Sequence, residues 1–251
     1  MKKFLCCAVV FLCALGALKA ERMDYLRNGK LKIGVDLDAG GAITWLSQAD
    51  KSRNYINNYD RGRYVQQSYY GDADGSDWNG QPWMWNPVQA GNWQNKSAKL
   101  LKYRKMGGTI YVKTVPLHWA TGQLLEDCVM ECWITLKENV AVLKYRFEYL
   151  GNQSYTARHQ EMPAVFLDAD CNTLCFTEEK GLLRRLTNIG EKNQYAKISK
   201  NFAAFIDAKT KIGVGIYAPG TNEITYYRRK DSMQKVGPNS PACSYLAPIR
   251  T

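Results

Sequence analysis

Two histidines and one glutamate are the residues of this sequence best suited to proton transfer. His159 and Glu161 stand two apart in "RHQEMPAVF", and in an extended segment such residues project from the same face. An imidazole and a carboxyl group can divide the roles of acid and base if their environments separate their pKa values. His118, in "PLHW", is the only other histidine. The expected catalytic residues are therefore His159, Glu161 and His118; the alternative is that both histidines are ordinary surface or core residues.

A tryptophan-rich stretch, residues 71–93, carries side chains suited to holding a sugar. Sugars present apolar C–H faces and polar rims, so a sugar site needs aromatic platforms beside amides, carboxylates and arginines. Glycines, prolines and aspartates interrupt this stretch, which predicts an irregular loop without strand or helix. The expected ligand-binding residues, in or near this loop, are Arg63, Gln67, Trp78, Asn79, Trp83, Trp85 and Asn86.

The tryptophans of this loop are expected to divide into two roles. Trp78 stands among aspartate and glycine, so we expect it to face the ligand together with Asn79. Trp83 and Trp85 are expected to point inward and anchor the loop; the alternative is that they only close one end of the core. The cleft that this loop is expected to rim would also contain Arg63, His159 and Glu161.

Neither a metal nor a cofactor is expected. In "DADGSDWNG", Asp72, Asp74 and Ser76 match the first ligands of an EF-hand, but Asp77 replaces the required glycine and Trp83 the final glutamate. An EF-hand is therefore excluded, and a turn-rich loop is favoured over an irregular calcium site. The spacing of the cysteine pairs suggests a zinc site, but no histidine lies at ligand spacing. The chain also lacks the P-loop, the dinucleotide fingerprint and G-x-S-x-G.

The first twenty residues, 1–20, have the pattern of a secretory signal peptide. Two lysines precede an apolar run from Phe4 to Leu18, and Ala20 offers a small residue for cleavage. The run is short for a membrane span, so cleavage is favoured over an uncleaved anchor. We expect residues 21–251 to form a single domain of a secreted or periplasmic protein, with no membrane span after cleavage.

The charge of the chain favours an acidic partner. The formal net charge is +11, and removing the signal, with three lysines and no acidic residue, leaves +8. In an exported protein this favours an anionic glycan or a cell surface, although a solvated basic surface is the simpler explanation of any one cluster. No group of residues supports nucleic-acid recognition, so no nucleic-acid partner is expected.

Apolar and polar residues alternate with a period of two along most of the chain. "KLKIGVDLD" (30–38) is a half-buried strand, and "GGAITWLS" (40–47) follows a glycine turn as its hairpin partner. Only 181–190 allows a short helical turn. Further strands are expected at 108–119, 126–136, 140–150, 163–168, 202–207 and 211–219. This pattern predicts an all-β chain folded as an antiparallel β-sandwich, with under about a tenth of its residues helical.

Five of the eight cysteines lie beyond residue 20. Cys128 and Cys132 are four apart in an expected strand, where the rise of about 3.3 Å per residue keeps them too far apart to bond. A bridge from either of them to Cys171 or Cys175 is feasible after export, and buried free thiols are the alternative.

Five stretches carry a family resemblance: "NGKLKIGVDLDAGGAITWLS", "RGRYVQQSYYG", "WMWNPVQAGN", "HQEMPAVF" and "CSYLAPIRT". Together they resemble a family of secreted bacterial proteins similar to the galactose mutarotase-like group of β-super-sandwiches. Relatives of this type continue past "SYLAPIRT" with further strands, so the resemblance implies that this chain lacks its last strands and exposes a sheet edge. It also implies the absence of the late glutamate that serves as general base in epimerases.

Two functions remain open at this stage. The first is a secreted carbohydrate-active enzyme that binds and processes a glycan in the Trp-rich cleft by His/Glu acid–base chemistry. It requires Glu161, or an aspartate such as Asp74, opposite His159 or His118. The second is a non-catalytic glycan-binding or structural envelope sandwich, which needs only platforms and hydrogen bonds. The distinguishing observation is whether an imidazole and a carboxylate converge within one pocket rimmed by the tryptophan loop.

Overall fold

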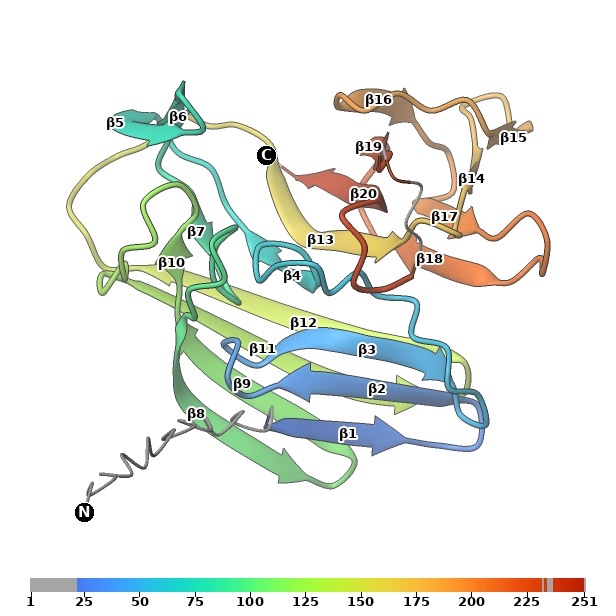
Figure 1. The fold of residues 1–251 in the computed structure, drawn as a ribbon, viewed down its shortest axis with the longest axis horizontal. Helices are drawn as coiled ribbons and strands as arrows, with labels where there is room; N and C mark the ends of the chain where they lie inside the picture. The colour runs from blue at the N-terminus through green and yellow to red at the C-terminus, as the bar shows by residue number, and fades with distance from the viewer. Residues whose placement is uncertain (1–21, 232, 234–236, 251) are drawn as a thin grey trace, which may run out of the picture.

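The computed structural model describes residues 22–231, 233 and 237–250, and these are folded entirely as strands and loops (Figure 1). The described residues contain no helix, which confirms the prediction of an all-β chain. Accordingly, that part of the chain holds no helical segment able to span a membrane. The expected signal peptide, residues 1–20, lies outside the described residues.

Two sheets pack face to face in the first half of the chain. The first sheet begins with β1 (Met23–Arg27), β2 (Leu31–Asp36) and β3 (Ala42–Gln48). The second is four-stranded, in the order β12-β11-β9-β8, with bounds Val140–Tyr149, Cys128–Lys137, Thr109–Val115 and Lys99–Met106. Alternate residues of both sheets, such as Ile33 and Val35 against Val112 and Ile134, are buried in one core. The period of two seen in the sequence therefore marks the two inner faces of a sandwich.

The first sheet continues into the second half of the chain. Its ten strands include the path β1-β2-β3-β4-β13-β20-β19-β16, and β7 and β10 join it beside β4. The further bounds are β4 Val65–Ser68, β7 Pro87–Val88, β10 Leu117–His118, β13 Gln160–Asp168, β16 Gln194–Lys197, β19 Glu223–Arg229 and β20 Cys243–Arg250. The segment "CSYLAPIR" was expected to precede a sheet edge. It is itself a central strand, paired with β13 and β19 on its two sides.

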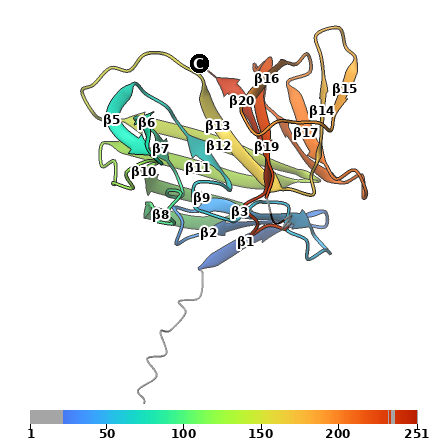
Figure 2. The same ribbon diagram turned by 45° about the horizontal axis from the view of Figure 1, so that its top comes forward.

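A smaller antiparallel sheet lies beside β16 and β19 (Figure 2). Its order is β15-β14-β17-β18, with bounds Leu183–Leu186, Thr173–Thr177, Phe202–Ile206 and Gly213–Tyr217. The stretch 181–190, which allowed a short helical turn, contains β15 instead, and β15 pairs along its whole length with β14. Leu174 and Phe205 of this sheet belong to the same core cluster as the sandwich.

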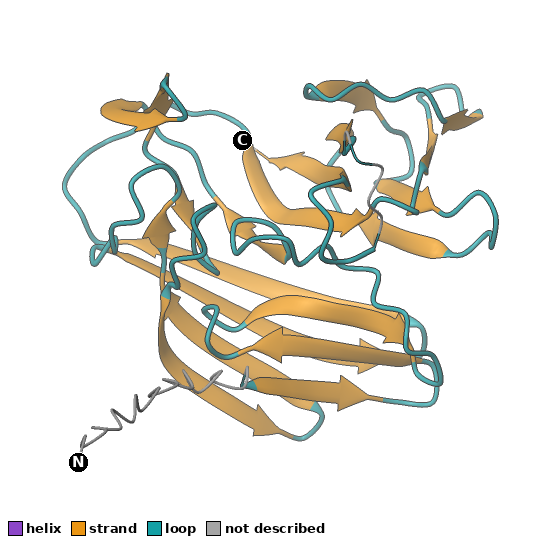
Figure 3. Ribbon diagram, in the orientation of Figure 1, coloured by secondary structure: helices purple, strands orange, loops and turns teal. Residues whose placement is uncertain are grey.

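The tryptophan-rich stretch contains a β-hairpin instead of the expected irregular loop. β5 (Ala73–Trp78) pairs with β6 (Gln81–Met84) through a two-residue turn. Asn79 and Gly80 have φ values of 52° and 74°, and consecutive left-handed residues define the tight hairpin turn that Asn-Gly favours. Figure 3 shows the hairpin at one corner of the molecule, outside the main sheets. The Asn-Gly pair in "DWNGQ" was the overlooked sequence signal.

The five cysteines beyond residue 20 are all free thiols. Cys128 and Cys132 both lie in β11, and they are not bonded to each other, as predicted from strand spacing. No disulfide joins either of them to Cys171 or Cys175, which are also free. The fold is therefore held by its core and its sheets, without covalent links among the described cysteines.

Candidate functional site

Asp74 of the hairpin and His118 of β10 form a carboxylate–imidazole pair. His118 Nε2 lies 2.7 Å from Asp74 Oδ2. His118 Nδ1 accepts hydrogen bonds from the backbone N–H groups of Ala120, at 3.1 Å, and Thr121, at 3.4 Å. The ring proton therefore sits on Nε2 and is donated to Asp74. Because both ring nitrogens are engaged, His118 orients the carboxylate and has no nitrogen free for a ligand.

The carboxyl group of Asp74 is ionised and reachable by solvent. Its Oδ1 accepts from the backbone N–H of Ser76, at 3.0 Å, and from the Ser76 hydroxyl, at 2.5 Å. Partial burial raises the pKa of Asp74, but the hydrogen bonds from Ser76 and His118 outweigh it, so the pKa lies below its ordinary value. The side chain remains 25% exposed. Asp74 thus presents a fixed negative charge that can accept hydrogen bonds from hydroxyl groups.

Three indole rings gather beside this pair. The ring of Trp78 lies 5.1 Å from that of Trp83, edge to face, and 6.0 Å from that of Trp119. All three are half-buried. Trp83 Nε1 donates to Asn86 Oδ1 at 3.3 Å, whereas Trp78 Nε1 is buried without a hydrogen-bond partner. Trp119 occupies the space over Gly62, where an added Cβ would come within 1.5 Å of the ring. The hairpin is thus attached to the body through tryptophan contacts.

Trp85 and Asn86 fix the base of the hairpin. Trp85 is 8% exposed, and its ring stacks on Tyr155 at 4.3 Å. The Asn86 side-chain amide donates to the Tyr69 carbonyl at 2.6 Å, within the protein interior. Trp85 therefore points inward, as expected for an anchor, while Asn79 at the turn is exposed.

Arg63 and Gln67 lie in the interior, and their contacts are with the protein itself. Arg63 pairs with Asp60 at 3.1 Å and donates to Asn57, at 3.1 Å, and to the Pro241 carbonyl, at 2.9 Å. The Gln67 side chain donates to the Glu131 carbonyl at 2.9 Å. The structure does not bring these two predicted ligand residues to the hairpin, and both brace the packing between loops and sheets.

Glu161 is the centre of a second polar cluster. This cluster lies on the face of the ten-stranded first sheet that points away from the main core, and that sheet is called the central sheet below. Glu161 lies on β13 opposite Ser68 of β4, and its carboxyl group is hydrogen-bonded by Tyr245, Tyr70 and Ser68. Burial raises the pKa of Glu161 above its ordinary value, and these hydrogen bonds only partly oppose the rise. The residue is 8% exposed. Glu161 is therefore a buried carboxyl group that holds its proton more firmly than an exposed one.

His159 lies close to this group through Tyr70. The His159 ring is 6.2 Å from the ring of Tyr70 and 6.0 Å from that of Tyr195. Burial lowers the pKa of His159; Glu223 opposes this shift and Arg158 adds to it. The predicted His159–Glu161 pair thus borders one tyrosine, and the pKa shifts favour the neutral form of each side chain. Neither residue contacts the Asp74–His118 pair.

A ladder of aromatic rings on the same face was missed by sequence reasoning. Phe166, Tyr245 and Tyr227 stand directly opposite one another on β13, β20 and β19. Their rings are 4.8 Å apart between Phe166 and Tyr245, and 4.6 Å apart between Tyr245 and Tyr227. The signal was the alternation in "CSYLAPIR", which places Tyr245 and Leu246 on opposite faces. Recognising that segment as a strand would have assigned Tyr245 to one face, but its place beside Glu161 comes from the pairing of β20 with β13.

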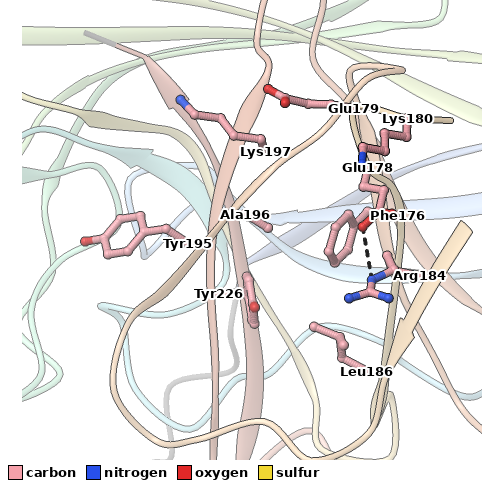
Figure 4. A pocket seen from close by; sticks show the side chains of 10 residues that line it. All are labelled: Phe176, Glu178, Glu179, Lys180, Arg184, Leu186, Tyr195, Ala196, Lys197 and Tyr226. Carbon is pink, nitrogen blue, oxygen red and sulfur yellow. Dashed lines mark ion pairs between the residues drawn. The ribbon is translucent and has the colours of Figure 1, made fainter. Parts of the chain in front are cut away.

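A groove of about 520 Å³ separates the edge of the smaller sheet from β16 (Figure 4). Phe176 and Tyr226 are its buried residues, and Arg184 pairs with Glu178 at 3.1 Å on its rim. Tyr195 lines the groove and also contacts the His159 ring. No predicted ligand-binding residue lines this groove, although it borders the predicted catalytic His159. Among the described residues, no cluster of three or more His, Cys, Asp or Glu side chains could hold a metal ion.

Comparison with known proteins finds similarity at the level of the fold. No protein-family profile matches it, and no curated protein matches it. The structure is similar to a 4-α-glucanotransferase from Thermococcus litoralis, with a TM-score of 0.55 and 12% identity over 92% of this chain. The match spans only 35% of that enzyme.

Two further solved structures align over 90% of the chain. A galactose mutarotase-like protein from Clostridium acetobutylicum matches with 9% identity over 84% of its own length and a TM-score of 0.48. A galactose mutarotase related enzyme from Lactobacillus acidophilus matches with 10% identity over 85% of its length and a TM-score of 0.42. The predicted fold class and the predicted resemblance to this group are confirmed. At these identities the likeness concerns the fold alone.

Proposed function

We propose that this chain is a carbohydrate-binding β-sandwich whose ligand lies against the β5–β6 hairpin. The ligand would stack on the Trp78–Trp83 indole pair and accept or donate hydrogen bonds at Asn79 and Asp74. The observation that carries the proposal is the solvent-accessible, ionised Asp74 carboxylate, fixed by His118 beside half-buried indole rings.

This set of side chains matches the chemistry of a sugar. An indole ring covers the apolar C–H face of a pyranose, and a carboxylate accepts hydrogen bonds from neighbouring hydroxyls. His118 and Ser76 hold the Asp74 carboxylate in one orientation before the ligand arrives, which reduces the entropy lost on binding. The exposed Asn79 adds an amide that can both donate and accept.

The fold supports the same conclusion by analogy. The similar structures include a glucanotransferase and galactose mutarotase-like proteins, all of which have names that concern sugars. The expected signal peptide would export the chain, so its glycan would be met in the periplasm or outside the cell. These points support a sugar ligand but do not define its identity.

The geometry at the hairpin favours binding over catalysis there. An imidazole and a carboxylate do meet at the hairpin, whereas the condition set for the enzymatic hypothesis was that they converge within one pocket rimmed by the tryptophan loop. Moreover, His118 donates from Nε2 and accepts at Nδ1, so neither nitrogen is free to exchange a proton with a ligand. Proton transfer at this pair would require His118 to give up its backbone contacts.

The proposal is tested by measuring glycan binding to residues 21–251. A glycan array identifies the ligand, and titration calorimetry then compares the parent with Asp74→Asn. Asn retains the shape of Asp74 but loses its charge, so we expect affinity to fall about tenfold, the effect of losing a charge-assisted hydrogen bond. Asp50→Asn, at an exposed loop position, is the matched control and should bind like the parent. Equal affinity for Asp74→Asn and Asp50→Asn would contradict the proposed site.

Glycan processing at His159 and Glu161 is the second candidate function. Burial raises the pKa of Glu161 and lowers that of His159. Both residues border Tyr70, and the His159 ring also lies against Tyr195, which lines the groove. A protonated carboxyl and a neutral imidazole are the acid and base that ring opening or glycosidic cleavage needs. The test is to follow anomer exchange and release of reducing ends from any glycan that the chain binds. A parent protein that yields neither product excludes this candidate; turnover lost in Glu161→Gln and His159→Ala supports it.

A further inference from the structure

The outer face of the second sheet carries an ordered row of side chains that crosses all four of its strands. Arg104 of β8 stands opposite Tyr111 of β9, Tyr111 opposite Trp133 of β11, and Trp133 opposite Lys144 of β12. Their neighbours in sequence, such as Ile110 and Ile134, are buried in the core. Because side chains alternate between the two faces of a strand, the row points away from the core.

A second row runs parallel to the first, two residues away along each strand. It consists of Lys102, Lys113, Glu131 and Arg146, each opposite the next. Together the two rows hold five basic residues, one acidic residue and two aromatic rings. This patch, here called the Tyr111–Trp133 face, therefore carries a strong positive excess at neutral pH.

The two aromatic rings at the centre of the face are held in place by charged neighbours. The Tyr111 and Trp133 rings lie 5.1 Å apart and are inclined by 40°. Lys144 Nζ lies 5.3 Å from the centre of the Trp133 ring. The Tyr111 hydroxyl donates to Glu131, which also pairs with Arg146 at 3.1 Å. Both rings remain half-buried, while Arg104 and Lys144 at the two ends of the row are exposed.

We propose that the Tyr111–Trp133 face binds a linear anionic polysaccharide whose sugar units carry carboxylate groups. The two rings would stack on the apolar faces of successive sugars, and Arg104 and Lys144 would neutralise carboxylates at either end of the row. Four neighbouring strands extend over about 14 Å, so the row contacts several units of an extended polymer. An arginine side chain matches a carboxylate with two parallel hydrogen bonds.

A polysaccharide is favoured over a nucleic acid because the expected signal peptide would export the chain, and the anionic polymers that an exported protein meets are glycans. Glu131 is only 6% exposed, and both of its carboxylate oxygens are engaged, one by the Tyr111 hydroxyl and the other by Arg146. It therefore fixes these two side chains and leaves the ligand contacts to the rings and the exposed basic residues. Glu148, which pairs with Arg146 at 3.1 Å, adds a second carboxylate. The face contains no residue of the β5–β6 hairpin, so this proposal can be tested independently of the proposed hairpin site.

The experiment measures binding of residues 21–251 to polygalacturonate, with neutral galactan and a single-stranded oligothymidine as comparison probes. The test variant is Arg104→Ala/Lys144→Ala, which changes two exposed residues. The control is Lys192→Ala/Lys200→Ala, which removes the same charge from exposed loop positions elsewhere. Trp133→Ala is a third variant, and the thermal midpoint of each variant confirms that it is folded.

We expect polygalacturonate to bind more tightly than galactan or oligothymidine, and binding to weaken as salt rises. Arg104→Ala/Lys144→Ala should weaken it about tenfold, because each exposed charge contact is modest and two are lost. Trp133→Ala should weaken it by a similar factor, while the control pair should change it less than about threefold. Equal losses in the test and control pairs overturn the proposal, as does tighter binding of oligothymidine or no binding of polygalacturonate.

Discussion

The β5–β6 hairpin and the outer face of the central sheet contain the same kinds of side chain in different surroundings. At the hairpin, Asp74 is accessible to solvent, and hydrogen bonds keep its pKa below the ordinary value. On the sheet, Glu161 is buried under Tyr70 and Tyr245, and burial raises its pKa. The two imidazoles differ as well, since His118 has both nitrogens engaged whereas His159 lies against the rings of Tyr70 and Tyr195.

This difference shows that burial, more than residue type, decides what a carboxyl group can do. An ionised, fixed carboxylate such as Asp74 is suited to holding hydroxyl groups of a ligand. A buried carboxyl whose pKa is raised, such as Glu161, is suited either to stabilising the fold or to donating a proton. The two regions can therefore be separated by experiments that change one while leaving the other intact.

The largest effect is expected from removing the anchor of the hairpin. Trp85→Ala empties a buried site that is now filled by a ring stacked on Tyr155. The free energy of unfolding should fall by about 3–5 kcal/mol, the usual cost of truncating a large buried aromatic residue. Denaturant unfolding measures this change. A loss below 1 kcal/mol, on the order of a surface substitution, would show that the hairpin does not depend on Trp85.

Removing the imidazole beneath the hairpin should cost less. His118→Ala leaves the Ala120 backbone N–H without an acceptor and takes one hydrogen bond from Asp74. We expect a loss of about 2 kcal/mol in the free energy of unfolding, the cost of an unsatisfied buried donor. The same variant should weaken glycan binding, because the Asp74 carboxylate is no longer fixed. A variant that loses neither stability nor affinity would contradict the positioning role of His118.

The stability of the folded protein should depend on pH through Glu161 in the central sheet. Its pKa is higher in the folded protein than its ordinary value, so its contribution to stability is present at acidic pH and is lost as pH rises through the folded pKa. Glu161→Gln keeps the shape of the side chain and cannot ionise. The thermal midpoint of this variant should therefore rise relative to the parent as pH increases above about 4.5, the ordinary value. A difference that stays constant or shrinks with rising pH would contradict the raised pKa.

The fold could be predicted from sequence because its main signal is local. Alternation in residues 30–48 gives β2, β3 and the glycine turn between them directly, as the observed pairing confirms. The β5–β6 hairpin was missed because aspartates and glycines outweighed the Asn79-Gly80 turn signal. β20 was missed because "CSYLAPIR" was interpreted as the segment before a missing strand, although its own alternation is that of a strand.

The candidate site could be predicted only in part, because it depends on contacts between distant segments. Asp74 and His118 are 44 residues apart in sequence, and only the pairing of β10 with β7 brings His118 beneath the hairpin. Glu161 and Tyr245 are 84 residues apart and meet through the β13–β20 ladder. Residue types and spacing suggested Asp74, His118, His159 and Glu161 as candidates for acid–base chemistry. Their surroundings, which set their pKa values, come from the tertiary structure.

The most direct test of the hairpin as a sugar site is the affinity of Trp78→Ala for the best neutral glycan found on the array. We expect binding to weaken about tenfold or more, since a stacked aromatic ring contributes roughly 1–3 kcal/mol. Trp45→Ala, at a half-buried indole of β3 that belongs to neither proposed site, is the matched control and should bind this glycan like the parent. If Trp78→Ala retains the parent's affinity for every glycan that the parent recognises, the hairpin only covers the core and the proposed binding site is wrong.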